Sequence, residues 1–480
     1  MKSASEKCDM GSSRRRFMRE SLGALAIAGF PTIVPSRVLG KAAPSNLIQI
    51  GQIGCGRIAR THDMKETIKL TDVARFVAVS DVDSVRIADS KTYVESYYAG
   101  KFGSSHAAGV KMYKDYHEML EDKSIDAVII STPDHWHAQP AIEAALAGKD
   151  IYLQKPASLT IREGRQMADV IKKTGRILQM GTQQRSELQF RLACELVRNG
   201  RIGKVKEILI GLPVDPSGDE EAQMPVPGNL DYNAWLGSTP EVYYTEKRVH
   251  PQSQDRKVRY DRPGWLRCEQ FGAGMITGWG AHHIDIAHWA MGTEHTGPIE
   301  VSALAQFPKR GLWDVHGSFQ VRFQYANGAT VYLSDKYPTG ERIIGEDGWI
   351  WVSRGSYKPG DPQPGAPRSA VFDASDVRIL REGIRPNEIH LHESHDHHLD
   401  WLESVKTRKE PAAPAEVGHR TCSACLIAHT AMKLGRDLRW DPDRERFIND
   451  DEANGMLARP QRAPFGTDLV LQKHGIATTR

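Results

Sequence analysis

The sequence predicts an α/β protein: a doubly wound parallel sheet in the N-terminal part, followed by a second α/β domain with a large, open and mostly antiparallel sheet. In the first part, apolar strand-like runs alternate with helical stretches, which is the pattern of a parallel sheet covered on both faces. After about Gln183, apolar and polar residues alternate, as in strands with one covered face. Residues 213–262 and 354–390 are rich in Pro, Gly and charge and are predicted to be long loops.

The periodic segments mark the expected elements in order. In the first domain, 44–182, we expect strands at 46–53, 74–81, 125–133, 149–153 and 176–181, and helices at 58–70, 138–147 and 162–173. In the second domain, 183–440, we expect strands at 204–212 and within 317–334, and helices at 393–406 and 421–434. Residues 441–480 carry little periodic signal and are expected to form an extended tail.

The composition fits an ordinary globular protein. The 480 residues are enough for two or three domains, and the net charge of +3 gives no reason to expect a nucleic-acid partner. No stretch approaches the ~20 apolar residues of a membrane span, so stable membrane insertion is not expected. Six cysteines in a chain of this length do not make a disulfide scaffold. Cys422 and Cys425 have redox-motif spacing but fall within a predicted helix, which favours buried free thiols.

The first 43 residues have the order of features found in a twin-arginine export signal. An arginine-rich pattern at 13–19 is followed by an apolar run at 22–35 and by small residues at 40–43, where cleavage is expected. A disordered basic N-terminus is the alternative. The signal predicts export by the twin-arginine route and a periplasmic mature protein.

A Gly-rich turn joins the first predicted strand to the first predicted helix. Gly54, Gly56 and Ala59 form a G-x-G-x-x-A pattern, in which the first Gly allows a tight turn and the second lets a pyrophosphate approach the backbone. The turn residues Arg57 and Ile58 open the helix, whose N-terminus attracts phosphate. Asp81, at the end of the next strand, is placed to accept hydrogen bonds from ribose hydroxyls and to repel a 2′-phosphate. The pattern predicts bound NAD rather than NADP; the alternative is a Gly-rich turn with an unrelated surface Asp.

Two further polar motifs follow predicted strands and so fall at the same, carboxyl edge of the sheet. After the strand at 125–133 the motif supplies Thr132, Pro133, Asp134 and His137, which are predicted cofactor contacts; a polar turn with a packed Trp is the alternative. After the strand at 149–153 come Gln154 and Lys155, also predicted to contact the cofactor. A lysine there can hold a substrate hydroxyl, although an isolated Lys-Pro is usually a solvated turn.

In the second domain, His282, Asp285 and Trp289 share one face of a predicted helix. A neutral histidine suits general acid–base work on an alcohol. A buried His–Asp hydrogen bond is one alternative, and a metal site drawing on the His-rich run 392–398 is another. That run lacks a clear H-x-x-x-H spacing, so no metal site is predicted.

Together these motifs resemble the glucose–fructose oxidoreductase/inositol dehydrogenase (Gfo/Idh/MocA) family, and its exported subgroup in particular, from about Leu47 to Pro464. The motifs are I-G-x-I-G-C-G-R-I-A at 50–59, T-P-D-H-W-H-A at 132–138, Q-K-P at 154–156, G-T-Q-Q-R at 181–185, W-G-A-H-H-I-D at 279–285 and E-V-G-H-R…L-G-R-x-L-R-W-D-P…E-R-F at 416–447. The resemblance implies that Lys155 and His282 are the catalytic pair.

Two positions depart from the family pattern. Gln154 stands where the family's E-K-P motif has Glu, and Gly278 stands where many members have an acid four residues before the catalytic His. Asp285 is therefore only a neighbour that could orient His282. Gln183, Arg185 and Asp285 are expected on the substrate side, with His137 a further candidate there.

The resemblance implies oxidation of a secondary hydroxyl on a sugar, polyol or glycoside by a homo-oligomer (dimer or tetramer). Outside the cytoplasm there is no ready pool of soluble NAD, so a tightly bound, internally recycled cofactor is expected. Two alternatives remain: redox-neutral glycoside cleavage through a transient 3-keto sugar, and a non-catalytic exported sugar-binding module. The two departures from the family pattern motivate the second alternative.

Overall fold

The computed structural model describes residues 47–104, 109–357 and 371–477. The predicted leader, 1–43, lies outside the described residues, and its role stays a prediction. Within those described ranges, no helix is both long enough and apolar enough to span a bilayer.

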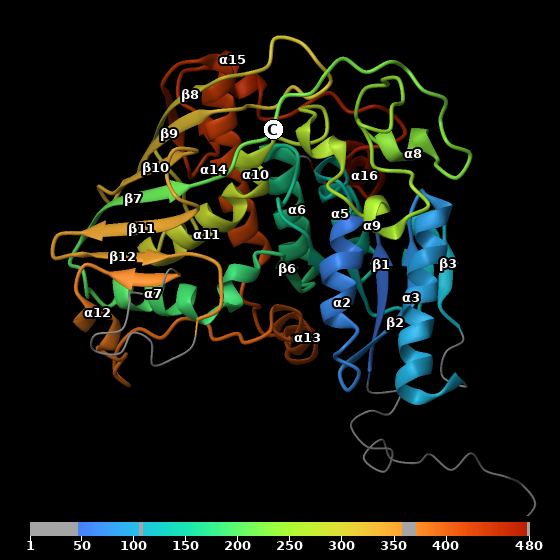
Figure 1. Cartoon of the computed structure of the whole chain (residues 1–480), viewed down its shortest axis with the longest axis horizontal. Coiled ribbons are helices and arrows are strands. Elements are labelled where there is room, and N and C mark those ends of the chain that lie inside the picture. The colour runs from blue at the N-terminus through green and yellow to red at the C-terminus, as the bar shows by residue number, and fades with distance from the viewer. Residues whose placement is uncertain (1–46, 105–108, 358–370, 478–480) are drawn as a thin grey trace, which may run out of the picture. The chain divides into compact units, whose positions relative to one another are not determined.

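The first domain is built on a six-stranded sheet in which every pairing is parallel, in the order β3-β2-β1-β4-β5-β6. This confirms the predicted doubly wound sheet. Figure 1 labels β1, β2, β3 and β6 of this sheet. All residues of β4 and β5 are buried, since helices cover both faces, and this explains the apolar sequence of β4 and of β5 after Asp150. The strands are β1 Ile48–Ile53, β2 Ala74–Ser80, β3 Lys111–Tyr113, β4 Ala127–Ile130, β5 Asp150–Leu153 and β6 Leu178–Met180.

The helices of this domain begin and end at recognisable signals. Helix α6 begins after Thr160, whose hydroxyl accepts from the backbone N–H of Glu163, and ends at the left-handed Gly175. The long α3, capped by Asp83, was not among the predicted elements, because its Tyr- and Ser-rich sequence carries little apolar periodicity. The elements are η3 Ala59–Asp63 (a π-helical turn), α2 Met64–Thr67, α3 Ser84–Phe102, α4 Tyr116–Glu121, η5 Asp134–Trp136, α5 Ala138–Leu146 and α6 Ile161–Thr174.

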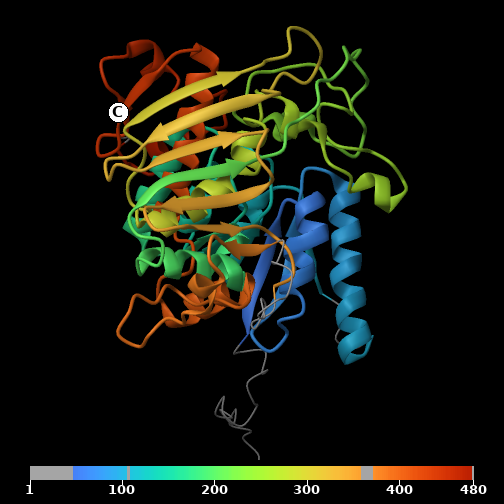
Figure 2. The same cartoon turned by 60° about the vertical axis from the view of Figure 1, so that its left-hand side comes forward.

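The second domain contains a nine-stranded sheet in the order β13-β12-β11-β7-β10-β9-β8-β14-β15 (Figure 2). Its described pairings are antiparallel except that of β7 with β10, so the predicted open, mostly antiparallel sheet is confirmed. The strands are β7 Val205–Gly211, β8 Glu300–Ala305, β9 Phe319–Gln324, β10 Thr330–Ser334, β11 Gly340–Gly345, β12 Trp349–Val352, β13 Phe372–Ala374, β14 Leu438–Asp441 and β15 Arg446–Phe447.

Alternation along these strands follows from one-sided burial. In β9, Phe319, Val321 and Phe323 are buried, whereas Gln320 and Arg322 between them are exposed. Helices α11 and α14 contact strands of this sheet and cover its apolar face. The helical elements of this half are η6 Gln183–Ser186, α7 Leu188–Arg198, α8 Tyr232–Leu236, α9 Arg256–Arg259, η7 Gly264–Arg267, α10 Met275–Gly278, α11 Gly280–Met291, α12 Val377–Arg381, α13 His397–Thr407, α14 Ala415–Leu434, α15 Asp451–Gly455 and α16 Thr467–Lys473.

Several segments are more structured than the sequence predicts. The expected loop 213–262 contains α8 and α9, and the described part of 354–390 contains β13 and α12. The predicted extended tail is wrong in detail, since residues after 441 supply β15, α15 and α16. The tail also returns to the first domain, where the Gly466 N–H donates to Oε1 of Gln139 over 2.7 Å. Elements of two to seven residues are too short to produce a periodic signal, and tertiary contacts hold them in place.

The cysteine prediction is confirmed for the described residues. Cys422 and Cys425 lie on α14, both buried and free of any disulfide. Burial raises the pKa of the Cys422 thiol to about 11, which makes it unreactive.

Candidate active site

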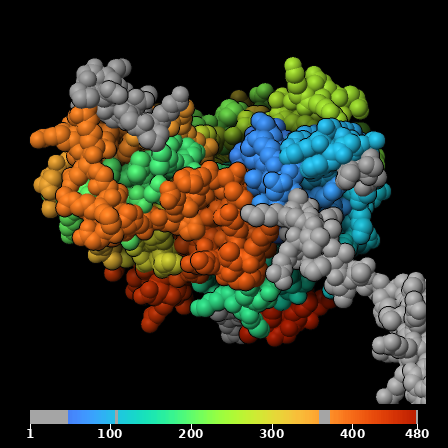
Figure 3. Space-filling view, turned by 90° about the horizontal axis from the view of Figure 1, so that it is seen from below, coloured from blue at the N-terminus to red at the C-terminus, as the bar shows by residue number. Residues whose placement is uncertain are grey.

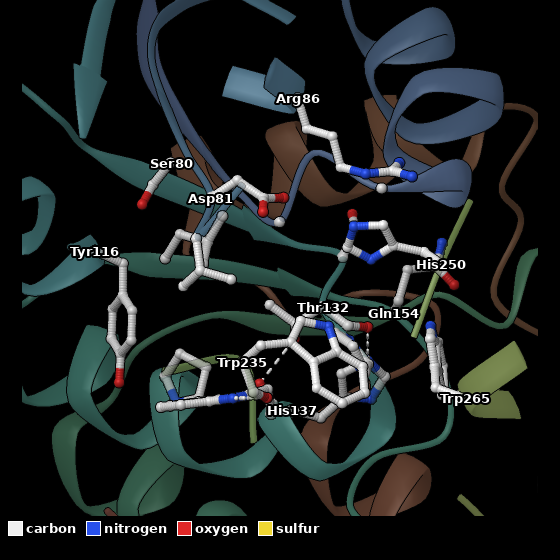
Figure 4. Close-up of a pocket in the computed structure, with 18 of the residues that line it drawn as sticks. Ser80, Asp81, Arg86, Tyr116, Thr132, His137, Gln154, Trp235, His250 and Trp265 are labelled. Carbon is white, nitrogen blue, oxygen red and sulfur yellow. Dashed lines mark hydrogen bonds between the residues drawn. The ribbon is translucent and has the colours of Figure 1, made fainter. Parts of the chain in front are cut away.

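A cavity of about 370 Å³ lies at the carboxyl edge of the parallel sheet (Figure 4). The eleven residues predicted to bind a cofactor all line it, although they come from four separate segments. They are Gly54, Gly56, Arg57, Ile58, Asp81, Thr132, Pro133, Asp134, His137, Gln154 and Lys155.

The Gly-rich turn has the shape that a bound pyrophosphate needs. Gly54 has a φ of +81°, and a Cβ there would meet the backbone of Ser131 at 2.9 Å, so only glycine fits. A Cβ at Gly56 would meet no protein atom within 4 Å. The second glycine therefore keeps open a space that the protein itself does not fill, at the start of a helix. These residues fit a dinucleotide.

Asp81 is held in place at the end of β2. Its two carboxylate oxygens accept from the backbone N–H groups of Cys55 (2.6 Å) and Asp83 (2.9 Å). Burial, together with the charge of Asp83, raises the pKa of Asp81 to about 6. In Figure 4 Asp81 lies on the opposite side of the cavity from Thr132 and His137. A fixed acceptor in this position suits ribose hydroxyls.

His137 connects two cavity-lining segments rather than presenting a free ring nitrogen. Its Nε2 lies 2.9 Å from the carbonyl oxygen of Thr132, and its Nδ1 lies against that of Pro156. Burial lowers the pKa of His137 to about 4, and the contacts with the two carbonyl oxygens oppose that shift. With both nitrogens occupied, His137 shapes the cavity wall, and the expected substrate-side role gains no support.

Lys155 follows β5 and lies at the junction of the two domains. Its Nζ donates to the carbonyl oxygen of Gly278 over 2.7 Å. Burial lowers the pKa of Lys155, and the nearby charge of Asp134 opposes that shift. Burial correspondingly raises the pKa of Asp134, and Lys155 opposes it. Gly278, which stands where many members of the family have an acidic residue, therefore supplies a backbone carbonyl oxygen as acceptor to Lys155.

His282 lies on α11, four residues after Gly278, and is not among the residues that line the cavity. It is 5% exposed, and its Nδ1 has no hydrogen-bond partner in the described part of the chain. Burial lowers the pKa of His282 well below its usual value, and the charges of Arg354 and Lys155 add to this. The imidazole is therefore neutral near pH 7 and keeps a nitrogen free to receive a proton.

Arg185 and Asp285 pair with each other in the protein interior. Nε and Nη2 of Arg185 donate to the two Asp285 oxygens over 2.7 and 2.8 Å. The Thr421 hydroxyl donates to the same carboxylate. The side chains are 3% and 1% exposed, and neither residue lines the cavity. The structure therefore gives no support to the expectation that both residues face substrate and that Asp285 orients His282: a buried guanidinium needs a carboxylate, and Asp285 already supplies one to Arg185.

Gln183 also lies away from the cavity, with its Nε2 donating to the Tyr152 hydroxyl over 3.1 Å. The lining residues that were not predicted from the sequence include Trp235, His250 and Trp265, from the segment between β7 and α10, and Phe465 from the tail. The three labelled ones project toward the cavity in Figure 4. Their aromatic side chains, within a stretch rich in Pro and Gly, were the only sequence signal for a role in the cavity. Such a stretch has no periodic pattern that predicts which part of the fold it packs against.

Three features together define a dinucleotide-binding protein. They are the parallel sheet of this strand order, the Gly-rich turn at the start of a helix and the carboxylate at the end of the second strand. Residues 48–182 match a family described as "Oxidoreductase family, NAD-binding Rossmann fold", and residues 216–358 and 375–467 match its "C-terminal alpha/beta domain". The chain belongs to this Gfo/Idh/MocA oxidoreductase family, and NAD is its cofactor.

Curated relatives match over part of the chain. Myo-inositol 2-dehydrogenase of Thermotoga maritima is 33% identical over 185 residues, which cover 38% of this chain and 48% of the relative. Inositol 2-dehydrogenase 2 of Saccharopolyspora erythraea is 24% identical over 264 residues, covering 55% and 58%. The chain thus spans about half the length of the curated relatives it matches.

Solved structures share the fold at low identity. The WlbA dehydrogenase of Bordetella pertussis, in complex with NADH and UDP-GlcNAcA, has a TM-score of 0.57 at 17% identity, covering 82% of this chain and 98% of that one. The aldose–aldose oxidoreductase of Caulobacter crescentus, complexed with glycerol, has a TM-score of 0.53 at 18% identity, covering 82% and 99%.

Proposed function

We propose that this protein is an NAD-dependent oxidoreductase that oxidises a secondary hydroxyl of a sugar, polyol or glycoside. The observation that carries the proposal is the partly buried Lys155 ammonium just after β5, in the lining of the same cavity as the Gly-rich turn. The family and the inositol dehydrogenases among its relatives support the same class of substrate.

The chain supplies two groups for the proton and oxygen of the substrate. When bound, NAD accepts the hydride from the carbon that carries the hydroxyl. Lys155 holds the hydroxyl oxygen and stabilises the negative charge that develops there as the C–O bond becomes a carbonyl. His282, neutral because it is buried, accepts the hydroxyl proton.

The walls of the cavity support a cofactor that stays bound through the reaction cycle. Trp235, His250, Trp265 and Phe465 line it from segments outside the parallel sheet. A retained cofactor also suits the predicted export by the twin-arginine route, which carries folded proteins to a periplasm without a supply of NAD. The same enclosure is compatible with redox-neutral glycoside cleavage, in which one substrate passes through a transient 3-keto sugar and returns the hydride.

Two finer points belong to the proposal. The fixed carboxylate of Asp81 favours NAD over NADP, because it would repel a 2′-phosphate. The exposed face of the nine-stranded sheet is a surface through which a homo-oligomer can form.

Mass spectrometry of the purified protein under native conditions tests the proposal. We expect one NAD per chain and an N-terminus processed near residue 43. Adding sugars, polyols and glycosides should then produce the absorbance of reduced nicotinamide, or a cleaved glycoside without net reduction. Protein that carries no NAD and turns over only with added cofactor would contradict retention, and binding without any keto product would identify a sugar-binding module.

A further inference from the structure

A second group of chemically active side chains lies behind the cavity, away from the proposed reaction. His62 and Asp63 are neighbours in the π-helical turn η3, and His398 lies in the first turn of α13. Their ligand atoms all lie within 4.8 Å of one another. Figure 3 shows the orange surface that includes the α13 region next to the blue surface of the first residues of the parallel-sheet domain.

Two distances within this cluster are close to those between the ligands of one metal ion. Nδ1 of His62 lies 3.1 Å from Oδ1 of Asp63, and Nε2 of His398 lies 3.5 Å from the same oxygen. Two ligands at about 2.0–2.1 Å from a tetrahedral zinc ion are roughly 3.3 Å apart. Two imidazoles and one carboxylate also form a donor set that first-row divalent ions prefer.

The charge of Asp63 is the first reason to expect a cation. Its side chain is 0% exposed, and within the described residues its only ion-pair partners are the two histidines. A buried, ionised carboxylate without a lysine or arginine is costly unless another positive charge is present.

The second reason is independent of charge. Nε2 of His398 is buried, with the side chain 2% exposed, and has no hydrogen-bond partner among the described residues. A buried ring nitrogen that faces a carboxylate oxygen without bonding it is costly to leave unsatisfied, and a metal ion would satisfy it. The opposite side of the cluster is open, because the His62 side chain is 38% exposed, and this gives an entry path and room for water as a further ligand.

The carboxylate has the surrounding hydrogen bonds that metal ligands usually have. Oδ1 of Asp63 accepts from Nε2 of Gln154 over 2.8 Å, and Oδ2 accepts from the Ser131 hydroxyl over 2.7 Å. Gln154 lines the cofactor cavity. An ion in this cluster would therefore join α13 to the first helix of the parallel-sheet domain and fix the orientation of Gln154.

We propose that Nδ1 of His62, Oδ1 of Asp63 and Nε2 of His398 bind a divalent first-row metal ion such as Zn²⁺. The sequence did not reveal this site, because His398 belongs to a His-rich run whose own spacing is poor, and its two partners lie more than 300 positions earlier. The ion joins the two halves of the chain and takes no part in hydride transfer.

The test uses the full chain, stripped with a chelator and titrated with Zn²⁺ and then with Co²⁺, whose visible absorption reports its ligands. We expect one ion per chain, a rise in the unfolding temperature on adding Zn²⁺, and loss of binding in His398→Gln by more than the ~100-fold that removal of a supporting hydrogen bond costs. Ser131→Ala should weaken binding by about 10- to 100-fold.

Matched variants separate coordination from folding. His395→Gln, in the same run but with an 80% exposed side chain, should bind like the unaltered chain. Because His398 also stacks on Tyr152, with ring centroids 4.5 Å apart, His62→Asn provides a second variant at a more exposed ligand. The proposal is overturned if Zn²⁺ leaves the unfolding temperature of the unaltered chain unchanged, or if folded His62→Asn retains full affinity. Either result would mean that the three side chains hold one another without a metal ion.

Discussion

The polar motifs of the first domain line the cavity, whereas two polar residues expected to contact substrate in the second domain pair with each other in the interior. The three motifs that follow β1, β4 and β5 all reach one cavity, residue by residue. The motifs around Arg185 and Asp285 carry equally polar side chains, yet these two residues bond to each other in the interior. The carboxyl ends of parallel strands meet at one edge by topology, whereas the direction of a helix face in the second domain depends on its packing. Polar residues after a parallel strand are therefore the safer guide to a site.

The largest effect is expected from Lys155→Ala. Loss of the group that holds the substrate oxygen should reduce turnover about 100- to 10,000-fold, while NAD stays bound. The rate of NAD reduction by an accepted sugar measures this, and Lys172→Ala, at an exposed position of α6, is the control. Near-normal turnover would remove Lys155 from the mechanism and leave the cavity as a binding site only.

Arg185→Ala tests the other side of the comparison. Removing one partner of a buried ion pair should reduce the free energy of unfolding by about 3–5 kcal/mol, because the Asp285 charge is left uncompensated. Denaturant unfolding measures the loss. Arg378→Ala, which removes an exposed ion pair with Asp376, should leave stability nearly unchanged. A raised KM with unchanged stability would instead restore the substrate role that the sequence suggested.

The smallest effect is a displacement of the pH profile of kcat/KM. Burial lowers the pKa of His282 well below 6.5, so its neutral form persists to lower pH and the acid limb should lie below 6.5. Burial also lowers the pKa of Lys155 from 10.5, so the protonated form that holds the oxygen is lost earlier and the alkaline limb should lie below 10.5. Lys155→Ala should abolish the alkaline limb in its residual activity. An alkaline limb that survives in that variant would assign it to another group.

The sequence by itself determined the parallel sheet, the open antiparallel sheet and the cofactor cavity. Buried parallel strands need continuous apolar runs, and a pyrophosphate turn needs glycine at Gly54, where a Cβ would collide with Ser131. These requirements are local, so the sequence of a single segment is enough to predict them.

Only the tertiary structure decided which polar side chains pair with one another in the interior and which segments from outside the parallel sheet line the cavity. Arg185 and Asp285 are 100 positions apart, and Trp235 and Phe465 reach the cavity from segments without periodic signal. His398 meets Asp63 only because α13 packs against the helix that follows the Gly-rich turn. Contacts of this kind depend on how separate helices and strands pack against each other. The spacing of residues along the sequence does not predict them.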